Sequence, residues 1–281
     1  MSSQKRKFWV AGATGFLGSH LLRALQQRGH DVVAVSKNGG EQHGVAVARL
    51  DILNQEAVTE SARGVDGAFL VTGRVSRDRD DAESLHRDNV LGTESALRGL
   101  RAAGVKRVVV ASTSGTLAVS REAERVADET CRAPLEIIAR WPYYRTKLYA
   151  ERAALDANRP PELEVVVVNP SLLLGPGDLR ESSTGDVRKF LERGIPAIPA
   201  GGMAFVDVRD AAVGLLLAFE RGRPGERYLL NGKNLTIAAF FQRLERISGV
   251  KAPLLRMPAS RAFALGLNQV LTKAVEAIGG R

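Results

Sequence analysis

The chain has 281 residues, of which 44% are hydrophobic and 25% charged, the balance of an ordinary soluble globular protein. This composition excludes disordered, collagen-like and disulfide-rich classes, and the length allows one large domain or a large domain with a small satellite. The net charge is +9, and residues 232–281 alone carry eight basic and two acidic side chains. Such a basic segment can attract nucleic acid, an anionic membrane surface or an acidic substrate, so charge alone does not choose a partner.

Cysteine and histidine content bears on the compartment and on metal binding. Cys131 is the single cysteine, so no intramolecular disulfide can form, which fits a reducing cytoplasm. The four histidines have no metal-ligand spacing, and we expect no metal site. No stretch approaches the roughly 18 apolar residues of a membrane span. We therefore expect a cytoplasmic protein with no transmembrane segment.

The first half of the chain alternates short apolar runs with helical patterns. Strands buried on both faces are predicted at residues 8–11, 32–35, 45–48, 68–71 and 106–111. Helices are predicted between them, at residues 17–28, 55–63 and 82–103. A helix at 143–157 and a strand at 163–169 continue the pattern. The alternation predicts an α/β fold with a doubly wound parallel sheet, of the Rossmann type.

The regular alternation ends after Asn169, where prolines and glycines break the chain into loops. Further helices are predicted at residues 211–220 and 237–248. We expect an NAD(P)-binding domain over residues 1–169, completed by about 204–231, and a smaller substrate-binding segment made of 170–203 and 232–281. Residues 261–278 have an amphipathic helical pattern, which more often covers a protein's own core than a membrane or a partner.

The sequence GATGFLG at 12–18 lies between the first predicted strand and the first predicted helix. Its GxxGxxG spacing is related to the GxGxxG dinucleotide fingerprint. Gly12 permits a tight turn, Gly15 lets the backbone approach a pyrophosphate, and Gly18 lets the helix pack against the sheet, while amides at the helix N-terminus bind the phosphates. The predicted cofactor contacts in this loop are Gly12, Thr14, Gly15, Phe16, Leu17 and Gly18.

The end of the second strand indicates which dinucleotide binds. A carboxylate at this place would hydrogen-bond the ribose of NAD, but the chain has Ser36 and Lys37 there. A hydroxyl and an ammonium suit a 2′-phosphate, so NADP is favoured and NAD is the alternative. The alternative is that Lys37 is an ordinary solvated lysine of a loop, with no contact to a cofactor. Asp51 follows the third strand, and it could bind the adenine amino group or cap the next helix. The adjacent Ile52 is also a predicted cofactor contact.

The sequence WPYYRTK contains Tyr143 and Lys147, which share one face of a predicted helix because they are four residues apart. A lysine ammonium at this distance would lower the pKa of the tyrosine and make the phenol a competent acid or base for a carbonyl or an alcohol. Taken alone, a tyrosine and a lysine at this spacing are more often an ordinary exposed pair on a helix than a catalytic pair. Tyr144 is three residues from Lys147 and ranks second.

Three adjacent hydroxyls, Ser112, Thr113 and Ser114, follow the fifth predicted strand. Open α/β sheets place ligands at this end of their strands, so one hydroxyl could hold a substrate oxygen beside the tyrosine. Spacing does not choose among the three, and a turn that caps backbone groups is the structural alternative.

In this order, the glycine loop, the hydroxyls and YxxxK resemble the extended short-chain dehydrogenase/reductases, the NAD(P)-dependent epimerase/dehydratase family. Three further segments are similar to family patterns: Asn89-Val90-x-Gly92-Thr93, NPSLLLGPGD at 169–178 and FVDVRDAA at 205–212. The resemblance implies that Thr113 orients the substrate, that Tyr143 is the acid/base, and that Lys147 binds ribose and tunes Tyr143. It also implies that the backbone at Pro170 lies near the nicotinamide. The helices at 82–103 and 143–157 would form the interface of a homodimer.

Departures from the family pattern favour an NADP(H)-dependent oxidoreductase for a carbonyl or alcohol. Ser36-Lys37 replaces the acid usual in NAD-retaining sugar epimerases, and STSGT at 112–116 is closer to dihydroflavonol-reductase-like members than to dehydratases. Residues 221–236 resemble hopanoid-associated sugar epimerases instead, so a nucleotide-sugar epimerase is the alternative. A non-catalytic NADP-binding regulator is the alternative of another class. The basic segment favours a small anionic substrate over nucleic acid, because no nucleic-acid-binding module is visible.

Overall fold

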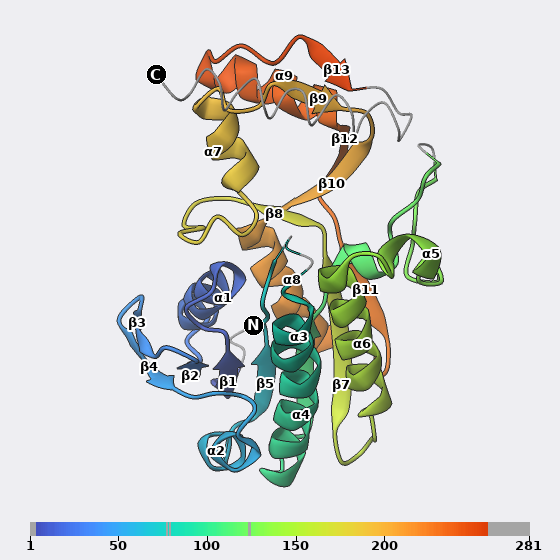
Figure 1. The fold of residues 1–281 in the computed structure, drawn as a ribbon. Coiled ribbons are helices and arrows are strands. Elements are labelled where there is room, and N and C mark those ends of the chain that lie inside the picture. Colours follow the sequence, from blue (N-terminus) through green and yellow to red (C-terminus); the bar gives the residue numbers. More distant parts are fainter. Residues whose placement is uncertain (1–3, 77, 79, 123–124, 258–281) are drawn as a thin grey trace. The chain divides into compact units, whose positions relative to one another are not determined.

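A computed structural model describes residues 4–76, 78, 80–122 and 125–257 (Figure 1). The chain divides into two compact units. Unit 1 contains Met1–Arg180 and Val206–Asn231, and unit 2 contains Glu181–Phe205 and Gly232–Arg281. Residues 170–180, expected in the substrate-binding segment, belong to unit 1. The amphipathic pattern predicted at 261–278 lies outside the described residues.

Unit 1 is built on a sheet whose order is β11-β7-β6-β5-β1-β2-β4-β3. Its strands are β1 (Lys7–Ala11), β2 (Asp31–Ser36), β3 (Gly40–Gln42), β4 (Val45–Arg49), β5 (Gly67–Leu70), β6 (Arg107–Ala111), β7 (Glu164–Pro170) and β11 (Arg227–Leu230). Only β3 runs antiparallel to its neighbour in this sheet. The predicted doubly wound parallel sheet is confirmed. A short strand, β8 (Leu172–Leu174), follows β7.

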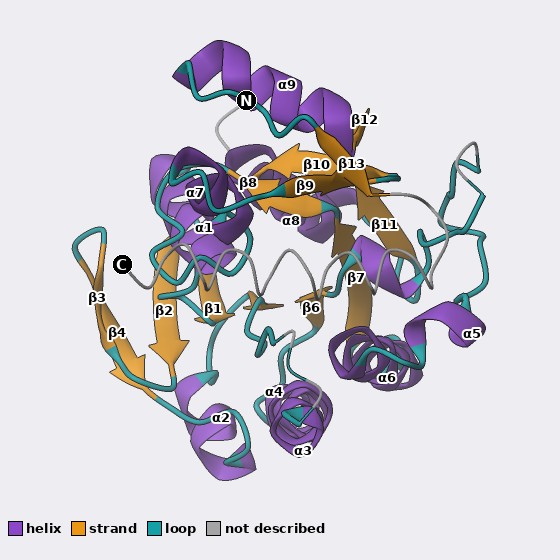
Figure 2. Cartoon of the chain, turned by 45° about the horizontal axis from the view of Figure 1, so that its top comes forward, coloured by secondary structure: helices purple, strands orange, loops and turns teal. Residues whose placement is uncertain are grey.

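Helices cover both faces of the sheet (Figure 2). On one face lie α1 (Phe16–Gln27) and α8 (Val208–Arg221), and on the other lie α2 (Gln55–Ser61), α4 (Gly92–Ala102) and α6 (Pro142–Asp156). Because both faces are covered, consecutive strand residues are apolar. In β1, Phe8 and Val10 join the core under α1 and α8, whereas Trp9 and Ala11 join the core on the other side.

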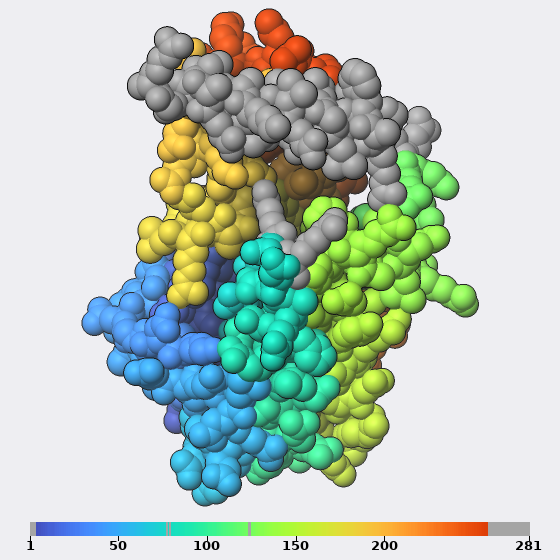
Figure 3. Space-filling model, viewed as in Figure 1, coloured from blue at the N-terminus to red at the C-terminus, as the bar shows by residue number. Residues whose placement is uncertain are grey.

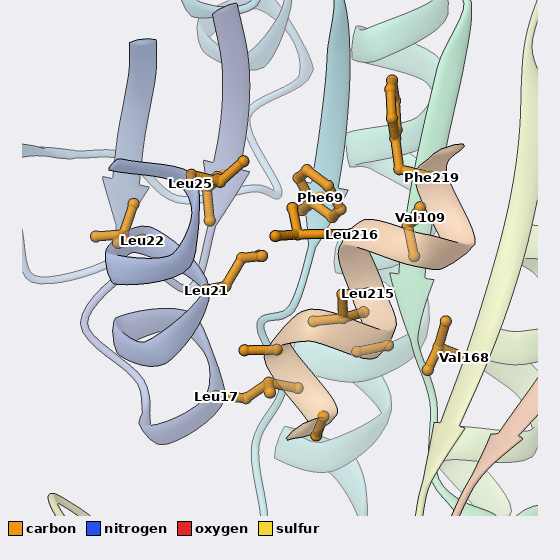
Figure 4. Close-up of a cluster of buried hydrophobic side chains, with 14 of the residues drawn as sticks. Leu17, Leu21, Leu22, Leu25, Phe69, Val109, Val168, Leu215, Leu216 and Phe219 are labelled. Carbon is orange, nitrogen blue, oxygen red and sulfur yellow. The ribbon is translucent and has the colours of Figure 1, made fainter. Parts of the chain in front are cut away.

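The core between α1, α8 and the sheet consists mainly of leucine, valine and phenylalanine (Figure 4). Leucines of α1 and α8 point toward one another and toward Phe69 of β5, Val109 of β6 and Val168 of β7. Burying one such side chain contributes about 1.5–3 kcal/mol. This core fixes the start of α1 against the ends of the central strands.

The prediction that the strand at residues 45–48 is buried on both faces is wrong. Only Val47 of β4 is buried there. The reason is a hairpin at the edge of the sheet that was not predicted from the sequence. In it, β3 pairs antiparallel with β4 and has a polar sequence, GEQ. Polar residues and short length are typical of edge strands, which do not bury both faces.

The predicted helix over 82–103 is one helical run with an irregular middle. It consists of α3 (Ala82–Leu85), the π-helical turn η1 (His86–Leu91) and α4. Single π-helical turns occur often at functional sites, and Asn89 lies in this one. Two short helices, η2 (Ser114–Thr116) and α5 (Leu135–Ile138), lie between β6 and α6.

Unit 2 contains short elements around a small apolar core. Its elements are α7 (Gly185–Leu191), β9 (Ala197–Pro199), β10 (Gly202–Asp207), β12 (Lys233–Thr236), α9 (Ile237–Ser248) and β13 (Leu255–Met257). β10 pairs with β12, and β9 pairs with β13. Phe190, Ile198 and Phe241 form the core. In the described part of the chain, no helix is long and apolar enough to cross a membrane.

Candidate active and cofactor site

The carboxyl end of β1 is the point where the strand order of the sheet reverses. β2 lies on one side of β1 and β5 on the other, so the connections leave β1 in opposite directions. Open α/β sheets bind ligands in the crevice outside this point. The sequence GATGFLG begins directly after β1 and continues into α1, so the predicted glycine loop lies at the place where this fold binds its ligands.

Gly12 makes the tight turn that the sequence predicts. Its φ is +85°, a conformation that side chains rarely adopt, and a Cβ there would lie 2.8 Å from the Cα of Thr72. The Gly12 amide donates to the carbonyl of Val35, and the Gly12 carbonyl accepts from the amide of Gly15. The turn is thus held between the ends of β2 and β5.

Gly18 lets the first turn of α1 approach the Gly12 turn closely, whereas the sequence predicted that it lets the helix pack against the sheet. A Cβ at Gly18 would lie 2.0 Å from the carbonyl oxygen of Gly12, so the first turn of α1 rests directly on the turn after β1. Gly15 is the N-cap of α1 and provides no side chain to satisfy the first amides of the helix. These amides, from Phe16 to Gly18, have no partner within the helix. The loop therefore fits a dinucleotide pyrophosphate.

Lys37 and Ser36 have different surroundings. The Lys37 side chain is 58% exposed, and its Nζ lies 3.7 Å from Asp51 Oδ2 and 3.6 Å from Asp88 Oδ1. Ser36 is buried, and its Oγ accepts a hydrogen bond from the Gly39 amide. Of the two residues expected to face a 2′-phosphate, Lys37 alone presents its polar group at the surface, next to the end of β2.

Asp51 lies in a turn and does not cap α2. Its Oδ1 accepts from the Leu53 amide, whereas the N-cap of α2 is Asn54, which accepts from the Ala57 amide. The capping role considered for Asp51 is therefore wrong. Ile52 packs close to Gly92, where a Cβ would lie 2.9 Å from Ile52 Cδ1.

Tyr143 and Tyr144 begin α6, with their rings 5.2 Å apart. The Tyr144 ring covers Gly115, because a Cβ at Gly115 would lie 2.1 Å from Tyr144 Cε1. Tyr144 is thus fixed against the turn after β6, which supports Tyr143 as the candidate acid/base. Burial raises the pKa of the Tyr143 phenol, and Tyr144 raises it further.

Lys147 is buried one turn after Tyr143, and its Nζ donates a 2.7 Å hydrogen bond to the carbonyl of Ala111 at the end of β6. Burial lowers the pKa of Lys147 to about 8, while the charge of Glu151 raises it. The expectation that Lys147 lowers the pKa of Tyr143 is not met, because the ammonium is directed to Ala111 and burial dominates at the phenol.

The three adjacent hydroxyls after β6 are separated by their hydrogen bonds. Ser112 Oγ donates to Glu151 Oε2 at 2.5 Å, so its hydroxyl is engaged in the interior. Thr113 is the N-cap of η2, and its Oγ1 accepts a long, 3.3 Å hydrogen bond from the Gly115 amide. The Thr113 hydroxyl keeps its own proton to donate, as a substrate-orienting group requires.

Asn89, from the segment Asn89-Val90-x-Gly92-Thr93, connects the stretch after β5 to α6. Asn89 accepts from the Arg74 amide at 2.7 Å and donates to Thr146 Oγ1 on α6. A Cβ at Gly73 would lie 3.3 Å from Asn89 Oδ1 and 3.7 Å from Lys147 Nζ. The segment after β5 thus touches both the turn at Gly12 and the lysine. Pro170 ends β7 and is buried next to Asn169.

Sequence reasoning missed a buried polar cluster beneath this site. Glu151 accepts hydrogen bonds from Ser112, Thr116 and Asn169 and forms an ion pair with Arg227. Helical spacing offered a signal, because Glu151 lies four residues after Lys147 and eight after Tyr143 and so shares their face. Glutamate at such a position is usually exposed, and its burial depends on donors from three other segments of the chain.

Comparison with known proteins gives a consistent result. Residues 8–230 match the model of the NAD dependent epimerase/dehydratase family. A 4-hydroxy-2-methyl-3-oxo-4-farnesyl-3,4-dihydroquinoline-1-oxide ketoreductase of Stigmatella aurantiaca is 35% identical over 274 residues, which cover 91% of this chain and 78% of the relative. A cinnamoyl-CoA reductase 1 of Oryza sativa subsp. japonica is 31% identical over 264 residues, covering 88% and 77%.

A solved structure extends the match to the whole fold. A nucleoside-diphosphate-sugar epimerase from Pseudomonas aeruginosa superposes with a TM-score of 0.80 at 25% identity, covering 99% of this chain and 87% of that chain. Reductases and an epimerase are therefore both among the similar proteins.

These matches identify an NAD(P)-dependent enzyme of the extended short-chain dehydrogenase/reductase class, an oxidoreductase that transfers a hydride between a nicotinamide and a small molecule. The family match runs from β1 to β11, which are the first and last strands of the main sheet in chain order. The chain belongs to the NAD dependent epimerase/dehydratase family.

Proposed function

We propose that this enzyme is an NADPH-dependent reductase that converts a carbonyl of a small anionic molecule into an alcohol. The observation that carries the proposal is the arrangement at the carboxyl end of β6. Tyr143 lies one turn before Lys147, Lys147 is bonded to the Ala111 carbonyl, and Thr113 follows two residues after Ala111. A bound NADPH supplies the hydride, and the groups of the chain orient the carbonyl and deliver the proton.

In this proposal each residue has a separate role. Thr113 donates a hydrogen bond that orients the carbonyl oxygen, and Tyr143 gives that oxygen its proton. Lys147 provides the positive charge beside the ribose and the phenol. Burial raises the pKa of Tyr143, so the phenol holds its proton until the carbonyl oxygen gains negative charge on accepting the hydride.

The cofactor preference rests on the end of β2. We assign the pyrophosphate to the loop from Gly12 to Gly18 and the 2′-phosphate to Lys37. Lys37 is exposed and positively charged, and no acidic residue precedes it at the end of the strand. NAD is the alternative, because Asp51 and Asp88 lie within 4 Å of the Lys37 ammonium and compete for its charge.

A nucleotide-sugar epimerase is the second candidate, and the structural match to a nucleoside-diphosphate-sugar epimerase favours it. An epimerase must first remove a hydride from an alcohol and then return it. The sequence STSGT at 112–116 has no acidic residue after Thr113, which favours a reductase instead. Both residues that define the reaction, Tyr143 and Lys147, are present, which speaks against a non-catalytic regulator.

We infer a homodimer from the surface of α3, α4 and α6, which lie side by side on one face of unit 1 (Figure 3). Leu91 of η1 and Tyr149 of α6 are exposed there, each at 42%. We also infer a cytoplasmic location, because the single cysteine, Cys131, fits a reducing compartment.

The proposal is tested by NADPH oxidation in the presence of a panel of aldehydes, ketones and acyl-CoA thioesters, with and without acidic groups. We expect turnover with NADPH to exceed turnover with NADH and to favour anionic members of the panel. NAD that copurifies with the protein and does not exchange, together with no turnover of added NADPH, would support the epimerase instead.

A further inference from the structure

Glu151 is an almost completely buried carboxylate in the interior of unit 1. The residue is 2% exposed, although glutamate is seldom fully buried unless it is paired. Its Oε2 accepts three hydrogen bonds, from Ser112 Oγ at 2.5 Å, Asn169 Nδ2 at 2.7 Å and Thr116 Oγ1 at 2.8 Å. Its Oε1 accepts from Arg227 Nη1 at 3.1 Å.

These donors surround the turn that contains Thr113. Ser112 and Thr116 lie on either side of Thr113, and both are bonded to the same carboxylate oxygen. Asn169 also donates to the Thr113 carbonyl at 3.1 Å, and Thr116 Oγ1, whose one proton is shared between Glu151 and this carbonyl, lies 2.9 Å from it. The carboxylate therefore connects α6 directly to the turn after β6, to the end of β7 and to β11.

From this geometry we propose that Glu151 is a positioning residue for hydride transfer. Its carboxylate holds the Ser112–Thr116 turn against α6, so that Thr113 keeps its place relative to Tyr143 and Lys147. It also places a negative charge one helical turn from Lys147, on the same face of α6. This inference rests on the proposed function, because it concerns the same three residues.

The charges around Lys147 single out Glu151. Tyr143, Tyr144 and Glu151 lie one turn from Lys147 on the same face of α6, and Arg227 pairs with Glu151. Arg74 follows Gly73, which lies close to Lys147 Nζ. The elements packed against α6 carry further titratable groups: Glu83 on α3, His86, Arg87 and Asp88 on η1, Glu94, Arg98 and Arg101 on α4, Glu136 on α5 and Glu164 on β7. Arg74 pairs with Asp81 and Asp88, and Arg87 pairs with Asp88. Against the effect of burial, Glu151 is the group whose charge raises the pKa of Lys147.

The first test measures Lys147 directly, without cofactor or substrate. In protein labelled with ¹³C at the lysine Cε, the resonance missing from Lys147→Met belongs to Lys147. We expect its titration midpoint near pH 8 in the wild type. In Glu151→Gln we expect it lower by about one pH unit, because the attraction between opposite charges is lost. An unchanged midpoint in Glu151→Gln would overturn the proposal.

A matched control removes another ion-paired carboxylate of unit 1, at the opposite end of β6 and β7 from the Ala111 carbonyl that accepts from Lys147. Glu164 begins β7 and pairs with Arg107, and both side chains are partly buried. Glu164→Gln should leave the Lys147 midpoint and the pH profile unchanged. If Glu151→Gln does not fold, Arg227→Met provides the second variant. It leaves Glu151 without its competing cation, so the Lys147 midpoint should rise, and a midpoint that stays in place would contradict the proposal.

The second test measures kcat/KM for carbonyl reduction against pH. Glu151→Gln should lower kcat/KM on the order of 10- to 100-fold, as expected when reacting groups are misplaced by about 1 Å. Its basic limb should also move to lower pH. A loss of activity with the basic limb at the wild-type pH would show a merely structural role. If the wild type reduces no carbonyl while the Lys147 midpoint shifts as expected, the proposed function fails and the electrostatic role of Glu151 stands.

Discussion

Tyr143 and Tyr144 differ in their surroundings, although they are adjacent at the start of α6. Tyr144 covers Gly115, whereas Tyr143 is the phenol one turn before the buried Lys147. Tyr143→Phe keeps the ring and removes the proton donor, so kcat should fall by about 10²–10⁴-fold, the usual contribution of a general acid. The measurement is steady-state NADPH oxidation with the best carbonyl substrate.

Tyr144→Phe is the matched control, because it keeps the ring that packs on Gly115. Its kcat should remain within a few-fold of the wild type. A larger loss in Tyr144→Phe than in Tyr143→Phe would exchange the roles of the two tyrosines.

Lys37 tests the choice between the two dinucleotides. Removing a charged hydrogen bond to a phosphate costs about 1.5–3 kcal/mol. Lys37→Ala should therefore lower kcat/KM for NADPH by roughly 10- to 150-fold and leave the value for NADH nearly unchanged. Lys5→Ala is the control, since Lys5 is also an exposed lysine paired with an aspartate, Asp31. Equal losses with both cofactors would refute the assignment of Lys37 to the 2′-phosphate.

At the scale of elements, the loop between β1 and α1 depends on Gly18. A Cβ there would meet the Gly12 carbonyl at 2.0 Å, a backbone contact that cannot be relieved by moving a side chain. Gly18→Ala should reduce the free energy of unfolding by about 1–3 kcal/mol, as overpacking does, and weaken NADPH binding. Urea unfolding and NADPH fluorescence measure the two effects.

Gly185→Ala provides the control for an alanine in the first turn of a helix. Gly185 begins α7, and its Cβ would make an ordinary 3.4 Å contact with Glu181. We expect it to be neutral or stabilising by up to about 1 kcal/mol. If both variants lose the same stability, the tight approach of α1 to the Gly12 turn is not the cause.

The central strands and the long helices could be predicted from the sequence because their signals are local. The segment EVVVVNP of β7 is apolar at consecutive positions, which only a strand covered on both faces requires. β3 could not be predicted, because GEQ is three residues long, polar and defined only by its pairing with β4. The π-helical turn around Asn89 likewise has no local signature.

The candidate site likewise contains residues with a local sequence signal and residues whose role depends on distant segments. The residues of contiguous motifs, from Gly12 to Gly18 and from Tyr143 to Lys147, could be identified from spacing. Spacing places Glu151 on the helix face of Lys147, but its burial could not be predicted, because its partners Ser112, Asn169 and Arg227 come from three distant segments that only the sheet brings together. The pKa of Tyr143 also depends on burial, which helical spacing alone does not reveal.

At the scale of the whole molecule, the inferred homodimer makes the surface of α3, α4 and α6 an interface. Tyr149→Glu places a charge on this surface, so light scattering should report a monomer where the wild type is a dimer. Leu254→Glu is the control, because Leu254 is 95% exposed and belongs to unit 2. A monomeric wild type at tens of micromolar, or dissociation by Leu254→Glu, would contradict the inferred interface.

The proposed reaction is a net transfer of a hydride from NADPH to a carbonyl, and isotope labelling can follow that hydride. The enzyme is incubated with NADPH deuterated at C4, in separate reactions for each face, and with the best carbonyl substrate, and the product is analysed by mass spectrometry. We predict one deuterium in the product alcohol from one of the two faces and one NADP⁺ per alcohol. An alcohol without deuterium from either face, or no consumption of NADPH with any carbonyl, would contradict it.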